Sequence, residues 1–306
     1  MEANVDISSM VKKINVYKKE KNAVILAHNY QHLEVQKVAD FVGDSFQLSR
    51  LAADLNPDLI IFCGVKFMAE TAKLLSPRSK VLLSDGDAGC PMADMVDPVE
   101  LKQFKDNNPD HLIVCYVNSS VEVKALSDVC VTSSNAVKIV NKLPKKKPIL
   151  FVPDQNLGSY VMSKTNRKIS LWHGMCPIHH LNMTVHDVHT AKLMHPKHSV
   201  IVHPECIPEI VKIADFVGST SELAKYTENN DMLVIGTEVG LIRALQEKYP
   251  NKSIYALSER AVCVNMKKTS LNDVLDTLLY ELNEIKIPDT LISSALLPIN
   301  KMMELS

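Results

Sequence analysis

The sequence predicts an α/β protein in which one doubly wound parallel-sheet unit occurs three times around a pseudo-threefold axis. Short apolar runs alternate with amphipathic segments along most of the 306 residues, which is typical of parallel strands connected by helices. Matching residues also recur about every 87 positions. His28, Tyr116 and His203 share one repeated position, and Ala39-Asp40-Phe41-Val42-Gly43 returns as Ala214-Asp215-Phe216-Val217-Gly218.

The first unit covers residues 1–96 and begins with an amphipathic helix. A short apolar run then ends at a polar turn, His28-Asn29-Tyr30, as expected of a buried strand followed by a loop. Ser45 stands where a helix N-cap would be, directly after the second strand. Strands are expected at residues 24–27, 40–43, 59–63 and 81–83, and helices at residues 6–21, 46–55 and 67–75.

The same order of elements returns in residues 97–183 and 184–268. Asp97-Pro98 signals a helix start, because Asp caps a helix and Pro fits its first turn. Residues 269–306 follow the repeat as a C-terminal helix, over residues 271–285, and a tail that must pack back or fray. Further strands are expected at residues 112–115, 128–131, 149–152, 169–172, 199–202, 215–218, 233–235 and 254–257, and helices at residues 135–143 and 184–194.

The composition excludes several classes of protein. The chain is 46% hydrophobic and 23% charged with a net charge of −1, so no basic surface for nucleic acid is expected. No apolar run is long enough to cross a membrane, and the N-terminus lacks a signal-peptide pattern. Seven cysteines, an odd count in a chain with its own core, favour a reducing, cytoplasmic location.

The repeat also sorts the cysteines. Cys115 and Cys130 align with apolar strand positions of the other units, and we expect them, like Cys63 and Cys206, to be structural. Cys90, Cys176 and Cys263 alone form a repeated triplet, and two of the three are followed by proline. Three thiolates on three separate loops suit a [4Fe–4S] cluster that keeps one iron open as a Lewis acid. Zinc would require closer ligand spacing, and three unrelated loop cysteines remain the alternative.

Polar side chains follow the first strand of each unit, and hydroxyl groups follow the second. Parallel α/β sheets bind ligands at the carboxyl ends of their strands, and helix N-termini attract anions. We therefore expect a central active site for a small ligand that carries phosphate or carboxylate groups. The residues at these positions are His28, Tyr30, Ser45, Tyr116, Asn118, Ser133, His203, Glu205, Ser219 and Thr220.

Nine motifs, in order from about Val24 to Lys268, resemble the quinolinate synthase family. Each alone is weak, but the ordered set is highly specific. The motifs are Ala27-His28-Asn29-Tyr30-Gln31, Gly43-Asp44-Ser45, Gly89-Cys90-Pro91, Tyr116-Val117-Asn118-Ser119, Thr132-Ser133-Ser134-Asn135, Pro153-Asp154-Gln155-Asn156-Leu157-Gly158, His203-Pro204-Glu205-Cys206, Gly236-Thr237-Glu238 and Cys263-Val264-Asn265-Met266-Lys267.

The resemblance implies a pseudo-threefold α/β enzyme with an oxygen-sensitive [4Fe–4S] cluster on Cys90, Cys176 and Cys263. It implies condensation of iminoaspartate with dihydroxyacetone phosphate to quinolinate, with loss of phosphate and water, in NAD biosynthesis. An aspartate-oxidising enzyme is the expected source of iminoaspartate. The family's functional positions carry over as His28, Tyr30, Ser45, Tyr116, Asn118, Ser133, His203, Glu205, Ser219 and Thr220.

Within this set, we assign proton transfer to Tyr30 and Glu205, assisted by His28 and His203. Phosphate and carboxylate groups are expected at Ser45, Ser133 and Thr220, and the precursor of the ring at Tyr116 and Asn118.

Two other functions remain open. One is a cluster-bearing sensor or binding protein without turnover. The other is a zinc or Cys–His hydrolase that uses Cys206 beside His203.

Overall fold

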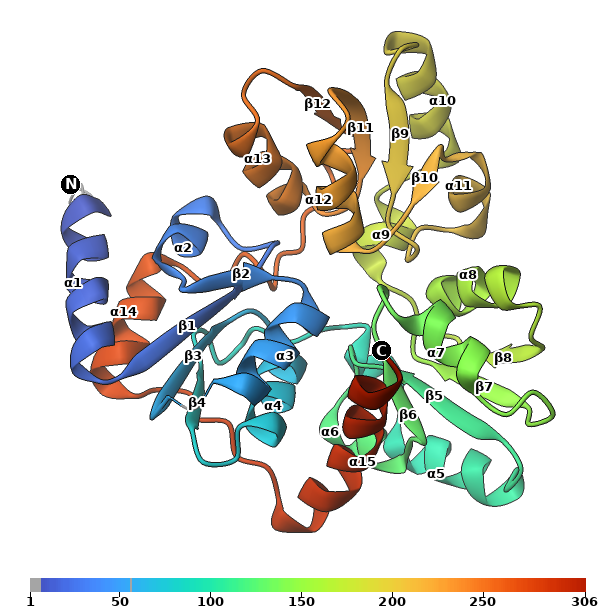
Figure 1. Ribbon diagram of the computed structural model, residues 1–306, viewed down its shortest axis with the longest axis horizontal. Helices are drawn as coiled ribbons and strands as arrows, with labels where there is room; N and C mark the ends of the chain where they lie inside the picture. Colours follow the sequence, from blue (N-terminus) through green and yellow to red (C-terminus); the bar gives the residue numbers. More distant parts are fainter. Residues whose placement is uncertain (1–6, 56) are drawn as a thin grey trace. The chain divides into compact units, whose positions relative to one another are not determined.

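The computed structural model describes residues 7–55 and 57–306, and these form three four-stranded sheets with helices between the strands (Figure 1). Every strand pair is parallel, and the three sheets share one strand order, in which the first strand lies between the second and the third. The predicted α/β class with three parallel-sheet units is confirmed. Position 6, where we predicted the first helix to begin, lies outside the described residues.

The first sheet belongs to a compact unit that ends at Cys90 and is completed by Val264–Pro288. Its core contains Ile14, Ile25, Ile61 and Leu82, all fully buried. Its strands are β1 (Ala23–His28), β2 (Phe41–Gly43), β3 (Leu59–Cys63) and β4 (Lys80–Leu83). Its helices are α1 (Ile7–Glu20), α2 (Leu33–Val38), α3 (Ser45–Asp54), α4 (Lys66–Leu75) and α14 (Leu271–Tyr280), the last of which packs beside α1.

The second sheet belongs to a second compact unit, made of Pro91–Cys263 and Asp289–Ser306. Its strands are β5 (Leu112–Tyr116), β6 (Val129–Val131), β7 (Ile149–Val152) and β8 (Ile169–Leu171). The helices around it are α5 (Pro98–Asn107), α6 (Val121–Leu126), α7 (Ala136–Lys142) and α8 (Gln155–Thr165), preceded by a short 3-10 turn, η1 (Ala93–Met95).

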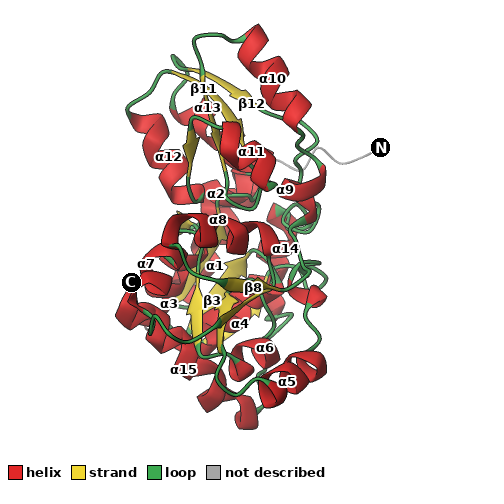
Figure 2. Ribbon diagram, turned by 90° about the vertical axis from the view of Figure 1, so that its right-hand side faces the viewer, coloured by secondary structure: helices red, strands yellow, loops and turns green. Residues whose placement is uncertain are grey.

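The third sheet lies in the same compact unit, and Figure 2 shows its strands between helices. A hydrophobic cluster formed by Val188, Val200, Ile210 and Val234 joins one face of the sheet to two helices. The strands are β9 (Ser199–Val202), β10 (Phe216–Val217), β11 (Met232–Gly236) and β12 (Ser253–Ala256). The helices are α9 (Pro177–Leu181), α10 (Val185–Met194), α11 (Pro208–Ile213), α12 (Thr220–Glu228) and α13 (Val239–Lys248).

Each unit repeats one polar tie between its first strand and the residue before its second strand. In the first unit, the Ile25 amide donates to Asp40 Oδ2 at 2.9 Å, and Lys18 Nζ lies 2.8 Å from Asp40 Oδ1. The same amide–aspartate bond measures 2.7 Å in the second unit and 2.8 Å in the third. In the second unit the equivalent residues are Ile113, Asp128 and Lys105. In the third unit they are Val200, Asp215 and Lys192. The repeated aspartates therefore fix the register between the first two strands of each sheet.

Three parts of the fold differ from the sequence prediction. The helix expected over residues 271–285 ends at Tyr280, because Glu281 adopts a left-handed conformation and caps it. The tail is itself a helix, α15 (Asp289–Leu305), which packs against α6 and β6. We did not predict six of the described helices, which are α2, α6, α8, α9, α11 and α13. In α8, Gly158 interrupts the apolar pattern, and a Cβ at this position would lie 2.5 Å from Leu171 Cδ2, so that the Leu171 side chain would have to shift.

No helix among the described residues combines the length and the apolar character needed to span a membrane.

Asp128→Ala is expected to lower the free energy of unfolding by about 1–3 kcal/mol, because the buried Ile113 amide loses a charged acceptor. Urea denaturation measures this. The control is Asp106→Ala, which removes only an exposed ion pair to Lys102 and should cost less than about 1 kcal/mol. Equal costs for the two substitutions would contradict a register role for Asp128.

Candidate active site

The same turn orients a histidine at the end of the first strand in two of the units. β1 ends at His28, and the Tyr30 amide donates to His28 Nδ1 at 3.1 Å. In the third unit, His203 follows β9, and the Glu205 amide donates to His203 Nδ1 at 3.3 Å. Since Nδ1 accepts in both turns, a neutral ring carries its proton on Nε2. All four side chains are buried.

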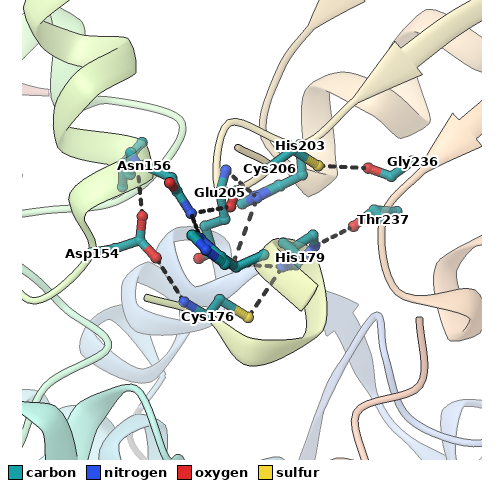
Figure 3. A network of polar contacts seen from close by, with 11 residues as sticks. Asp154, Asn156, Cys176, His179, His203, Glu205, Cys206, Gly236 and Thr237 are labelled. Atoms are coloured by element: carbon teal, nitrogen blue, oxygen red, sulfur yellow. Dashed lines mark hydrogen bonds and ion pairs between the residues drawn. The ribbon is translucent and has the colours of Figure 1, made fainter. Parts of the chain in front are cut away.

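Glu205 lies at the centre of a polar cluster with the buried His179 and His203 and the half-buried Cys176 (Figure 3). Its Oε2 is 2.7 Å from His179 Nδ1 and 3.8 Å from His203 Nδ1. The two imidazole rings stack with centroids 4.7 Å apart. His179 Nδ1 also lies 3.2 Å from Cys176 Sγ, and its Nε2 lies 3.0 Å from Thr237 Oγ1. One histidine therefore links a cysteine to a carboxylate.

The charges in this cluster follow from burial and hydrogen bonding. Burial lowers the pKa of His203 to about 3, so this ring is neutral at neutral pH. Burial by itself would raise the pKa of Glu205. The neighbouring histidines, with hydrogen bonds from the side chains of His179 and Tyr116, instead lower it below its ordinary value. Glu205 is thus an ionised carboxylate surrounded by donors.

Two amide side chains, those of Asn118 and Asn156, follow the strands β5 and β7. Asn156, just inside α8, donates to the Glu205 carbonyl at 2.9 Å and lies 2.9 Å from His180 Nδ1. Asn118 Oδ1 is buried and has no hydrogen-bond partner among the described residues. An acceptor left in this state is suited to a donor on a bound ligand.

The hydroxyl residues expected at helix starts differ from one another. The prediction that Ser45 caps α3 is wrong: Asp44 is the N-cap, with a capping box to Gln47, and Ser45 is the first helical residue. Thr220 likewise begins α12, after the N-cap Ser219. Ser133 lies in a turn, two residues before the N-cap of α7. Ser45, Ser219 and Thr220 therefore lie at a helix start, and Ser133 does not.

The seven cysteines divide by exposure as the repeat predicts. Four are fully buried, and the repeated triplet of Cys90, Cys176 and Cys263 is half-buried. Burial raises the pKa of the Cys206 thiol, which donates to the Gly236 carbonyl at 3.7 Å. A buried thiol with a raised pKa is a poor nucleophile, which disfavours the Cys–His hydrolase. The buried cysteines are Cys63, Cys115, Cys130 and Cys206.

Each cysteine of the triplet follows a loop that is anchored in the same way. In every unit, the first amide of the helix after the third strand donates to the carbonyl two residues before the cysteine. The bonds run from Lys66 to Ala88 at 2.8 Å, from Gln155 to Gly174 at 2.9 Å, and from Val239 to Ala261 at 2.9 Å. The triplet thus occupies equivalent positions at the carboxyl ends of the sheets, with Cys90 in the first compact unit and the other two in the second.

Cys176, His179 and Glu205 can hold a metal ion, because their ligand atoms all lie within 4.8 Å of one another. We did not predict His179. Its signal was its place three residues after Cys176, which puts both near the start of the short helix α9. Eight histidines between positions 173 and 203 obscured that signal.

Parallel sheets with an ionised acid, two histidines and a metal-competent cysteine at the strand ends define an α/β enzyme. The family model described as "Quinolinate synthetase A protein" matches residues 12–304. The chain therefore belongs to the quinolinate synthase family.

Several relatives named quinolinate synthase match the chain over nearly its whole length. The protein from Caldicellulosiruptor saccharolyticus is 48% identical over 305 residues, which cover 99% of this chain and 100% of the relative. The protein from Alkaliphilus metalliredigens is 48% identical, with 97% and 99% covered. The protein from Methanoregula boonei is 45% identical, with 98% and 99% covered.

In metal-free native protein, iodoacetamide at pH 8 is expected to modify Cys90, Cys176 and Cys263 and to spare the four buried cysteines. The buried thiols are inaccessible, and burial also raises the pKa of Cys63 to about 12. Peptide mass spectrometry measures the modification, with denatured protein, in which all seven react, as the control. Labelling of Cys63 or Cys206 as fast as Cys176 would contradict this assignment.

Proposed function

We propose that the chain condenses iminoaspartate with dihydroxyacetone phosphate to form quinolinate, releasing phosphate and water. Membership of the family supports the reaction. The observation that carries the proposal is the buried cluster in which Glu205 contacts His179 and Tyr116 beside Cys176. Such a cluster can move protons, which a condensation followed by dehydration requires. An aspartate-oxidising enzyme would supply the iminoaspartate.

The proposed cofactor is a [4Fe–4S] cluster held by Cys90, Cys176 and Cys263. These residues fit such a group because they alone are half-buried among the cysteines and because they share one loop position. When bound, a cluster with three protein ligands supplies an open iron that acts as a Lewis acid. His179 and Glu205, which contact each other next to Cys176, are then placed beside this cofactor.

We assign the proton transfers to Glu205 in the second compact unit and Tyr30 in the first. Glu205 Oε2 is an ionised acceptor, and His179 Nδ1, 2.7 Å away, is the group with which it exchanges a proton. His203 stays neutral, accepts the Glu205 amide and orients the carboxylate. His28 orients Tyr30 through the equivalent turn. The two rings pack edge to face, with their centroids 4.5 Å apart.

The remaining residues are assigned to substrate binding. Ser45 and Thr220 begin helices of ten and nine residues, whose N-termini favour the phosphate and carboxylate groups of the substrates. Ser219, the N-cap beside Thr220, and Ser133, in the turn before α7, contribute further hydroxyl groups. Asn118 Oδ1 is suited to accept a hydrogen bond from the substrate nitrogen, and Tyr116 to place the forming ring beside Glu205.

Anaerobically purified protein is expected to contain about four irons and four sulfides per chain and to form quinolinate from the two substrates. Metal analysis, the visible spectrum and product chromatography measure this. Cys176→Ser should lose the cluster and the activity, whereas Cys206→Ser, at a buried position outside the triplet, should keep both. One zinc without sulfide would overturn the cluster, and a full cluster without product would indicate a sensor.

Glu205→Gln is expected to lower kcat by about 100-fold or more while the iron content stays unchanged, because the amide cannot accept a proton. Tyr30→Phe should act in the same direction. Steady-state kinetics under argon measure both. The matched control is Glu209→Gln, at an exposed position on α11. Near-normal turnover in both active-site variants would contradict the assignment of proton transfer to Glu205 and Tyr30.

A further inference from the structure

Two buried acids, Asp154 and Glu238, occupy equivalent places after the third strands of the second and third sheets. Each is the N-cap of the helix that follows, and each accepts a hydrogen bond from the backbone amide of a cysteine in the triplet. The Cys176 amide donates to Asp154 Oδ2 at 2.9 Å, as Figure 3 shows, and the Cys263 amide donates to Glu238 Oε1 at 3.1 Å. The acids thus join the start of a helix to a cysteine loop.

Both oxygens of each acid are used in this arrangement. Asp154 Oδ1 accepts the Leu157 amide at 2.6 Å, and Glu238 Oε2 accepts the Gly240 amide at 2.6 Å. Both side chains are 0% exposed. A carboxylate accepts at two oxygens, whereas a primary amide accepts at one and would turn its NH₂ group toward an N–H. The geometry therefore requires an acid and not merely a capping residue.

The first unit shows that the fold does not depend on this arrangement. Val65 stands at the corresponding place before α4, and no side-chain hydrogen bond caps this helix. The backbone bond from Lys66 to Ala88 nevertheless anchors the loop as in the other units. Two of the three loops thus carry an additional bond from a buried acid to the cysteine itself. Burying an acid is costly, so its placement on a cysteine amide suggests a role at the cysteine.

We propose that Asp154 and Glu238 are positioning residues that hold Cys176 and Cys263 in the conformation in which their thiolates retain the cluster. The inference rests on the proposed cluster. Groups that hydrogen-bond to a metal-ligating residue and orient it have a strong effect on metal retention. Without them, the ligand leaves its binding geometry and must be returned to it before it can bind again. A cysteine whose amide is held by a buried acid dissociates from the metal less readily.

The test is the rate at which anaerobic holoprotein releases iron to a ferrous chelator, without any assay of activity. Asp154→Asn and Glu238→Gln are expected to release iron about 10- to 100-fold faster than the unsubstituted protein. Asp154→Glu and Glu238→Asp keep two acceptor oxygens, and their rates of iron release should lie much closer to the rate of the unsubstituted protein. The matched control is Asp97→Asn, because Asp97 caps α5 through one oxygen, which accepts the amides of Val99 and Glu100 and not the amide of a cysteine.

Release rates for the two amide variants within about twofold of the Asp97→Asn rate would overturn the proposal. Equal rates for amide and acid variants would do the same. If the amide variants do not fold, hydrogen exchange in the unsubstituted holoprotein decides: slow exchange at Cys176 and Cys263 supports the inference, and fast exchange overturns it. Unsubstituted protein without iron and sulfide would instead overturn the proposed cofactor, so the two failures are distinguishable.

Discussion

The candidate site depends on one backbone hydrogen bond that recurs in each unit. It joins the first amide of the helix after the third strand to the carbonyl two residues before a cysteine of the triplet. Parallel strands deliver their loops to one edge of a sheet, and this bond holds the last loop of each sheet at that edge. At Gly174 the backbones approach so closely that a Cβ would lie 2.5 Å from the Pro153 carbonyl. The position of each cysteine is therefore set by backbone geometry.

Burial governs the chemistry at the same edge. Glu205 is almost completely buried, and an isolated carboxylate in such a place would take up a proton. His179 and Tyr116 provide hydrogen bonds that keep it ionised, while His203 loses its charge on burial. The result is an ionised carboxylate that accepts hydrogen bonds from the donors around it. Asp154 shows the opposite outcome: burial and the neighbouring Glu205 raise its pKa, and the hydrogen bonds from the amides of Leu157 and Cys176 reduce that rise without reversing it.

The repeat explains which site residues could be found from the sequence. His203 and Glu205 were predictable because His28 and Tyr30 occupy the same positions, and the structure gives both pairs the same turn. His179 has no counterpart of this kind, and its partners Thr237 and Glu205 come from other segments of the chain. The N-cap of α3 was predicted one residue too late, at Ser45 instead of Asp44. Both residue types are good caps, and only the fold selects between them.

The sequence by itself determined the number of units, the parallel sheets and the division of the cysteines. Periodicity and spacing are properties of the chain, and burial follows from them. Only the tertiary structure decided which polar groups meet. His179 between Cys176 and Glu205, or Asp154 on the Cys176 amide, depends on how loops from different strands pack. Such contacts require distances of about 3 Å between segments far apart in the chain, and no local pattern encodes them.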